Sequence, residues 1–108
     1  MKRIDLQILN LSAMVAILVA PLFVIAQDSP ETLFNSRCAM CHGADGTGSS
    51  VGKKMGVPDL TSAEVQKMSD AELTDIIING KNKMPAYGKA LEAAEIKGLV
   101  AYIRTLKK

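Results

Sequence analysis

All the cysteine and histidine of this chain lies within five consecutive residues. Cys38 and Cys41 are separated by two residues, and His42 follows the second cysteine directly. Two thiols at this spacing can each form a thioether with one vinyl group of a haem, and the next residue then lies beneath the ring, where its imidazole can bind the iron. The pattern therefore predicts covalent attachment of one haem c, with Cys38 and Cys41 as thioether donors and His42 as an axial ligand.

Two cysteines and a histidine could also serve other thiol chemistry. A zinc site needs four ligands, whereas this segment offers three. A thiol–disulfide redox centre usually follows a strand in a βαβ setting, and the sequence contains no strand-like alternation. A plain disulfide would leave His42 without a role. A haem-free thiol protein is therefore the alternative, and it is excluded if haem colour stays with the chain after acidic organic extraction.

The other face of the iron needs a second ligand, and methionine is the usual partner of histidine in haem electron carriers. Met40 lies between the two thioethers and cannot reach that face, and Met68 directly precedes a helix start, where a core or surface packing role is expected. Met55 lies in a glycine-rich loop. Met84 lies in an irregular segment that Pro85 stiffens and keeps out of helix. The spacing favours Met84, with Met55 as the alternative.

The N-terminal residues 1–26 are typical of a signal peptide. Lys2 and Arg3 precede an uncharged, almost wholly apolar run over residues 13–26, which ends in a small residue. That run is shorter than the about 20 residues that a membrane span needs. We expect export to the periplasm, with residues 27–108 as the folded domain. An uncleaved anchor on the outer face of the inner membrane is the alternative.

Composition limits the classes of function. The 108 residues allow one domain, and 13 Lys and Arg against 11 Asp and Glu give no basic excess of the kind that nucleic-acid binding requires. The chain has two Phe, two Tyr and no Trp. A domain this small and this poor in aromatic residues usually needs a disulfide, metal or cofactor to complete its core.

The elements that must position these residues are helices. Ser29 and Pro30 open one helix, Ser69 and Glu72 form a capping box for another, and the last carries an apolar stripe at helical spacing. The three helices are expected over residues 31–41, 70–79 and 92–106, with irregular loops over 43–56 and 81–90. Loops of that length in a small domain are expected to wrap something.

Several segments together resemble a class I cytochrome c of the small bacterial monohaem type. They are the Cys38–His42 motif, Val57-Pro58-Asp59-Leu60, the run from Asn79 to Tyr87, and Leu99-Val100-Ala101-Tyr102-Ile103. The similarity covers nearly all of residues 31–106. It implies an all-α, cytochrome c-like fold with three main helices and long loops wrapped round one covalent haem.

The resemblance also implies particular roles. The methionine before proline in such a loop is the family's distal ligand, which assigns that role to Met84. The first and last helices are expected to cross, with Phe34 and Tyr102 meeting near the crossing. The carbonyl of Pro58 is expected to accept the second N–H of His42, and Tyr87 is expected to cover the haem edge, to hydrogen-bond there, or simply to pack.

Two positions depart from the family pattern. Pro30 stands where the first helix often has a small residue at the crossing. Glu92 stands where the last helix usually has a Ser or Thr cap, and Glu95 is expected to keep only half of a capping box.

The predicted function is outer-sphere transfer of single electrons, without enzymatic catalysis. With His42 and Met84 on the iron, no small-molecule substrate binds to the metal. Expected partners are a redox donor and acceptor, including membrane complexes. The alternatives are a membrane-tethered subunit of a larger dehydrogenase or oxidase complex, and an enzyme or gas sensor with an open iron position.

The distribution of lysines suggests how the protein would approach its redox partners. The distal and glycine-rich loops carry five lysines, which are Lys53, Lys54, Lys81, Lys83 and Lys89. A basic rim round the haem edge would steer the protein onto acidic partner surfaces, and an ordinary solvated surface is the alternative.

Overall fold

The computed structural model describes residues 16–21 and 28–108. Within those residues the regular elements are six α-helices: α1 (Pro30–Arg37), α2 (Ala39–His42), α3 (Ser50–Met55), α4 (Ala63–Gln66), α5 (Asp70–Asn79) and α6 (Ala93–Thr105). The all-α prediction is confirmed. No helix in this described part of the chain has the length and apolar character to cross a membrane. Most of the predicted signal peptide, and its predicted end at residue 26, lie outside the described residues.

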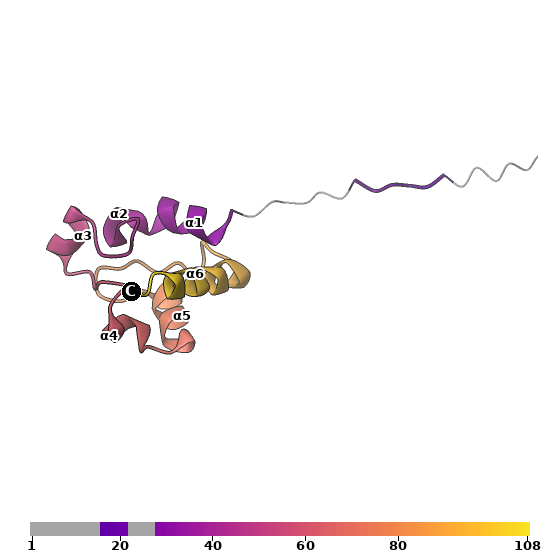
Figure 1. Cartoon of the computed structure of the whole chain (residues 1–108). Coiled ribbons are helices and arrows are strands. Elements are labelled where there is room, and N and C mark those ends of the chain that lie inside the picture. The colour runs from indigo at the N-terminus through magenta and orange to yellow at the C-terminus, as the bar shows by residue number, and fades with distance from the viewer. Residues whose placement is uncertain (1–15, 22–27) are drawn as a thin grey trace, which may run out of the picture.

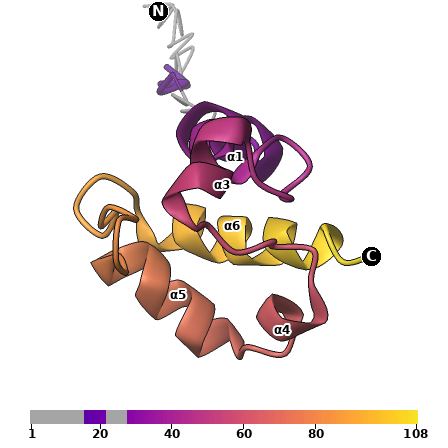
Figure 2. The same ribbon diagram turned by 90° about the vertical axis from the view of Figure 1, so that its left-hand side faces the viewer.

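The three predicted main helices correspond to α1, α5 and α6, and both α1 and α5 pack on α6. Helix α6 lies between the other two, with α1 crossing it on one side and α5 on the other (Figures 1 and 2). At the crossing, the rings of Phe34 and Tyr102 have centroids 5.1 Å apart and planes tilted by 52°. This confirms the predicted meeting of these two aromatic residues.

The crossing has its small residue on α6, not on α1. A Cβ built at Gly98 would lie 3.1 Å from Cγ of Pro30, which is tighter than an ordinary contact. Gly98 therefore allows the bulkier Pro30 ring to lie against α6. The departure noted at Pro30 is thus matched by a glycine on the facing helix.

The core is the set of apolar side chains that these helices turn inward. Helix α6 buries one stripe at helical spacing, and α1 and α5 each bury two residues against it. The buried apolar residues are Leu33, Phe34, Leu60, Val65, Leu73, Ile77, Leu91, Ile96, Leu99, Val100 and Ile103.

Two helix predictions were wrong in detail. Residues 43–56 were expected to be irregular throughout, but they contain α3, because Ser49 caps it by accepting the N–H of Gly52 at 3.0 Å. The first helix was expected to continue to about residue 41, but α1 ends at Arg37. Cys38, with φ −117° and ψ −33°, joins it to the short α2.

The start of α6 also differs from expectation. The backbone N–H of Glu92 donates to Oε1 of Glu95 at 3.0 Å, and the Glu92 side chain accepts the reciprocal bond from the backbone of Glu95. The capping box is therefore complete, since a glutamate carboxylate serves as acceptor in place of a Ser or Thr hydroxyl.

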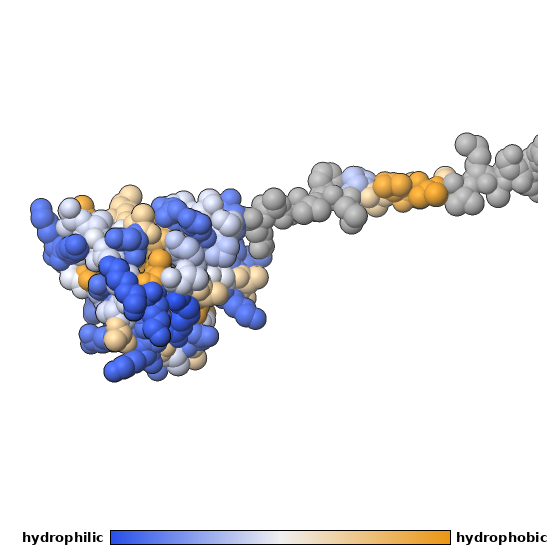
Figure 3. All heavy atoms as spheres, in the orientation of Figure 1, coloured by the Kyte–Doolittle hydropathy of each residue, from blue (hydrophilic) through white to orange (hydrophobic). Residues whose placement is uncertain are grey.

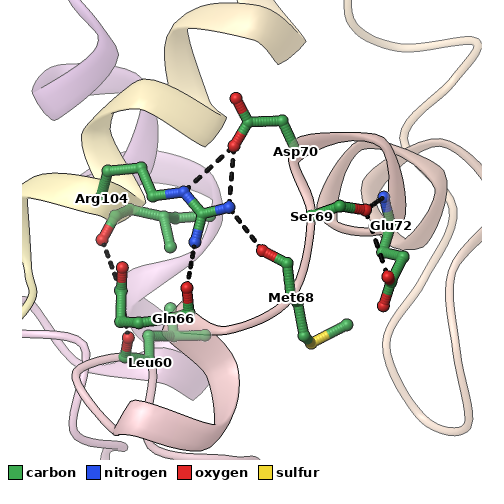
Figure 4. Close-up of polar contacts among 8 residues, drawn as sticks. Leu60, Gln66, Met68, Ser69, Asp70, Glu72 and Arg104 are labelled. Atoms are coloured by element: carbon green, nitrogen blue, oxygen red, sulfur yellow. Dashed lines mark hydrogen bonds and ion pairs between the residues drawn. The ribbon is translucent and has the colours of Figure 1, made fainter.

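Arg104 fastens α6 to the segment that precedes α5 (Figure 4). Its guanidinium donates to Oδ1 of Asp70 from Nε at 3.1 Å and from Nη2 at 2.8 Å, to the carbonyl of Gln66 at 2.9 Å, and to that of Met68 at 2.6 Å. The Gln66 amide in turn donates to the carbonyl of Leu60 at 2.8 Å. These bonds hold an irregular stretch of backbone in one place.

Candidate haem site

The helices and loops enclose a cavity of about 450 Å³. This volume lies within the about 300–1,000 Å³ that is typical of ligand and cofactor sites. Cys38, Cys41, His42 and Met84 all line it, so the structure brings the four predicted site residues to one space. Met55 and Met68 line it as well.

The rest of the cavity wall is largely apolar. It includes the core residues Phe34, Leu60, Val65, Leu73, Ile77, Leu91, Leu99 and Ile103. The space-filling view shows apolar surface in the middle of the molecular face, with hydrophilic residues around it (Figure 3). A planar apolar group would complete this core, as the small size of the domain predicts.

The end of α2 is held by hydrogen bonds from the residues that lead into α3. The Ser49 hydroxyl donates to the carbonyl of Met40 at 2.6 Å, and the Ser49 N–H donates to that of Cys41 at 3.0 Å. The N–H of Gly48 donates to the carbonyl of His42 at 2.7 Å. Ser49 thus caps the start of α3 and satisfies the end of the attachment helix at once.

Gly52 lets α3 lie directly against that helix. It is buried, and a Cβ at this position would collide with the carbonyl oxygen of Cys41. Neither Ser49 nor Gly52 was among the predicted site residues. The cap signature of Ser49 was a signal for the start of α3, whereas nothing local in the sequence marks the contact of Gly52 with Cys41.

The two cysteines are half-buried and free of any disulfide. Burial raises the pKa of the Cys38 thiol to about 11, against the opposing effect of the Arg37 charge. Reactive redox thiols have lowered pKa values, because the thiolate is the nucleophile. The described residues also include no group of three or more His, Cys, Asp and Glu side chains arranged to hold a metal ion. The raised pKa of Cys38 argues against the thiol-redox interpretation of this segment.

His42 carries a buried nitrogen that the protein leaves unsatisfied. Its Nδ1 has no hydrogen-bond partner among the residues that the structure describes, so the predicted bond to the carbonyl of Pro58 is wrong for this structure, although Pro58 lines the same cavity. Burial also lowers the pKa of the imidazole, which favours the neutral form that binds metals. A buried polar atom normally has a partner. Nδ1 is an exception to that rule among the described residues, and the neutral imidazole on the cavity wall can bind the haem iron through its other nitrogen.

Met84 is held by a tight turn after α5. Lys81 and Met84 exchange backbone hydrogen bonds of 3.2 and 2.9 Å, and Asn82 adopts a left-handed conformation with φ 53°, which asparagine tolerates better than most residues. Pro85 follows directly. The side chain of Met84 is half-buried and packs against the core.

The alternative ligand, Met55, is placed differently. It is the last residue of α3, the helix that packs on the attachment helix, and its side chain is 37% exposed. Met68 lies against the core, on the segment that Arg104 holds. Met84 therefore combines partial burial with an anchored backbone in a segment separate from the attachment helices.

Charged residues at the cavity are mostly basic. Arg37, Lys81 and Lys83 line it, with Glu64 as an acid on the same wall. The other lysines of the predicted rim, Lys53, Lys54 and Lys89, are exposed but do not line the cavity. The basic character of the mouth thus comes from the end of α1 and the Met84 loop.

Comparison with known proteins places this geometry in a family. The family model described as "Cytochrome C oxidase, cbb3-type, subunit III" matches residues 26–103. The chain is 37% identical over 84 residues to the cbb3-type cytochrome c oxidase subunit CcoP of Azospirillum brasilense, in a match covering 75% of this chain and 28% of that protein. It is 33% identical over 82 residues to cytochrome c6 of Gracilaria tenuistipitata var. liui, covering 75% and 73%.

Solved structures agree. The c-type cytochrome KustC0563 matches with a TM-score of 0.71 at 31% sequence identity, covering 75% of this chain and all of that one. Cytochrome c6C from Synechococcus sp. PCC 7002 matches with a TM-score of 0.59 at 25% identity, covering 72% and 93%. The chain spans 28% and 26% of the length of two CcoP relatives, but most of the length of these small cytochromes.

Proposed function

The chain belongs to the cytochrome c family, and we propose that it carries single electrons through one covalent haem c whose iron is held by His42 and Met84. The observation that carries this proposal is the single cavity lined by both cysteines, the histidine and Met84. These donors belong to segments more than forty residues apart in the chain, and the fold brings them to one space.

Each residue has a defined task in this proposal. Cys38 and Cys41 would hold the group covalently, and His42 and Met84 would both bind its iron, which would leave no place on the iron for a substrate. When bound, the haem supplies an iron that alternates between its ferrous and ferric forms. The apolar wall excludes water and makes additional positive charge costly, so it favours the ferrous form. No side chain is assigned as a general acid, base or nucleophile.

The sulfur ligand is tested by a pair of variants. Met84→Ala is expected to abolish the weak far-red band of methionine-ligated ferric haem. It should also lower the reduction potential by a sizeable part of the about 0.8 V that axial ligands span in haem proteins. Met55→Ala, a matched change on the same cavity, should leave both properties close to wild type. The measurements are the optical spectrum and a redox titration of purified protein with its haem attached.

The reverse pattern would contradict the assignment. If Met55→Ala removed the far-red band and Met84→Ala retained it, the ligand would come from α3. If carbon monoxide bound readily to the ferrous wild-type protein, the open-iron alternative would replace the carrier.

A second candidate is a membrane-tethered cytochrome subunit of a larger dehydrogenase or oxidase complex. The description of the matching family model and the CcoP relatives favour it. The proposed location is outside the cytoplasmic membrane, after cleavage near residue 26 for a diffusing carrier or with an intact anchor for a tethered one. Determining whether purified protein begins at Met1 or near Gln27 separates the two.

A further inference from the structure

Tyr87 connects the two segments that carry the proposed iron ligands. Its hydroxyl donates to the carbonyl oxygen of Arg37 at 3.2 Å. Arg37 is the last residue of α1 and immediately precedes Cys38, whereas Tyr87 follows Met84 by three residues. This one hydrogen bond therefore joins the haem-attachment segment to the distal loop across fifty positions of sequence.

The backbone of Tyr87 is itself anchored. Its N–H donates to the carbonyl of Ile77 on α5 at 2.9 Å, and the next N–H, from Gly88, donates to that of Ile78 at 3.1 Å. Between this anchor and Met84 lie two residues, one of which is Pro85, with its restricted backbone. The segment that links Met84 to the anchored backbone of Tyr87 is short and restricted. The position of the Tyr87 hydroxyl is therefore coupled to that of the Met84 sulfur.

The Tyr87 ring is also part of the site wall. It lines the cavity, is half-buried, and packs against the core. A phenol keeps its proton at neutral pH, and burial raises the pKa of Tyr87 further, so the hydroxyl is available as a donor. The sequence suggested that Tyr87 would cover the haem edge, hydrogen-bond there, or pack, and the structure adds a backbone acceptor on the opposite segment.

We propose that Tyr87 is a positioning residue, whose hydroxyl holds the Met84 loop closed against the attachment segment and so keeps the methionine sulfur at the iron. The inference rests on the proposed function, because it takes Met84 as the ligand. Without the hydroxyl the loop opens more often, and an added ligand competes more successfully for the iron.

The test uses the haem-loaded protein and imidazole as the competing ligand of the ferric iron. Tyr87→Phe removes one oxygen atom and leaves the ring, and Tyr102→Phe is the same change at the α1–α6 crossing. We expect Tyr87→Phe to bind imidazole about two- to tenfold more tightly than wild type, the effect of losing one neutral hydrogen bond. Tyr102→Phe should bind it as wild type does, and both should show the far-red band before imidazole is added.

Different failures are distinguishable. If Tyr87→Phe retains the far-red band and binds imidazole no more tightly than Tyr102→Phe, the positioning role is wrong while Met84 ligation stands. If wild type lacks the band and binds imidazole as tightly as Met84→Ala, the proposed ligand set fails, and this inference with it. If Tyr87→Phe gains no haem in cells that load Tyr102→Phe, the hydroxyl acts in assembly, and the inference is overturned.

Discussion

At the scale of single residues, backbone contacts determine how the attachment motif is held. Gly52 is buried where any side chain would meet the carbonyl of Cys41, and Ser49 donates two hydrogen bonds to the end of the same short helix. A four-residue helix has few internal hydrogen bonds of its own. The orientation of Cys38, Cys41 and His42 therefore depends on α3 packing closely against them.

Gly52→Ala tests this dependence. The added methyl group forces α2 and α3 apart, and we expect the free energy of unfolding to fall by more than about 3 kcal/mol, the upper end of what overpacking typically costs, because the clash is with backbone atoms. Gly56→Ala is the control, because its Cβ would have no neighbour within 4 Å and only its left-handed φ of 81° would be strained, at about 1–2 kcal/mol. Denaturant unfolding of both haem-loaded variants gives the comparison. A Gly52→Ala protein as stable as Gly56→Ala would show that the contact can relax.

At the scale of elements, α6 joins the two halves of the cavity wall. One of its faces meets α1 through Tyr102 and Gly98, and Arg104 near its end holds the carbonyls of Gln66 and Met68. Met68 lines the cavity, so this wall is kept in place from α6. The ion pair with Asp70 adds little in comparison, because that carboxylate is 76% exposed.

Two substitutions separate the carbonyl bonds from the ion pair. Arg104→Lys keeps the charge but lacks the planar set of donors, so we expect a loss of about 1–3 kcal/mol from the carbonyls left unsatisfied. Asp70→Asn removes the ion pair together with a favourable charge in the first turn of α5, and should cost about 1 kcal/mol or less. Urea unfolding of the haem-loaded proteins measures both. Equal losses would mean that the ion pair, not the carbonyl bonds, holds the segment.

At the scale of the whole molecule, charge is arranged unevenly around the cavity. The chain carries a formal net charge of only +2, yet three of the four charged residues that line the cavity are basic. The net charge therefore understates the local field that an approaching partner meets. Small redox complexes of opposite charge can report that field directly.

Electron transfer to ferricyanide, an anion, is expected to slow as salt is added, because the Debye length shrinks to about 10 Å at 0.1 M ionic strength. Transfer to a cationic cobalt complex should not slow. Reversing Lys81 and Lys83 to glutamate should lower the ferricyanide rate about tenfold or more at low salt, while Lys97→Glu on α6 should change it little. Stopped-flow kinetics measures these rates. If neither rate depends on the salt concentration, the proposal of a basic rim is wrong.

The sequence alone determined what depends on residue type and local spacing. Two thiols three positions apart followed by an imidazole specify a haem-attachment pattern, and apolar stripes and caps predicted the all-α class and the main helices α5 and α6. These features are local, because a motif, a helix period and a capping box each involve residues within a few turns of one another. The prediction that Phe34 and Tyr102 meet came from resemblance to a family in which the first and last helices cross.

Other contacts between distant segments depend on tertiary packing and could not be predicted from the sequence. The contacts that the sequence did not reveal all end on backbone carbonyls. They are the contact of Gly52 with Cys41, the bonds of Arg104 to Gln66 and Met68, and the bond of Tyr87 to Arg37. Every residue has a carbonyl, so the acceptor leaves no mark on the sequence. Which carbonyl faces which side chain depends on how distant segments pack, and packing follows from the whole chain at once.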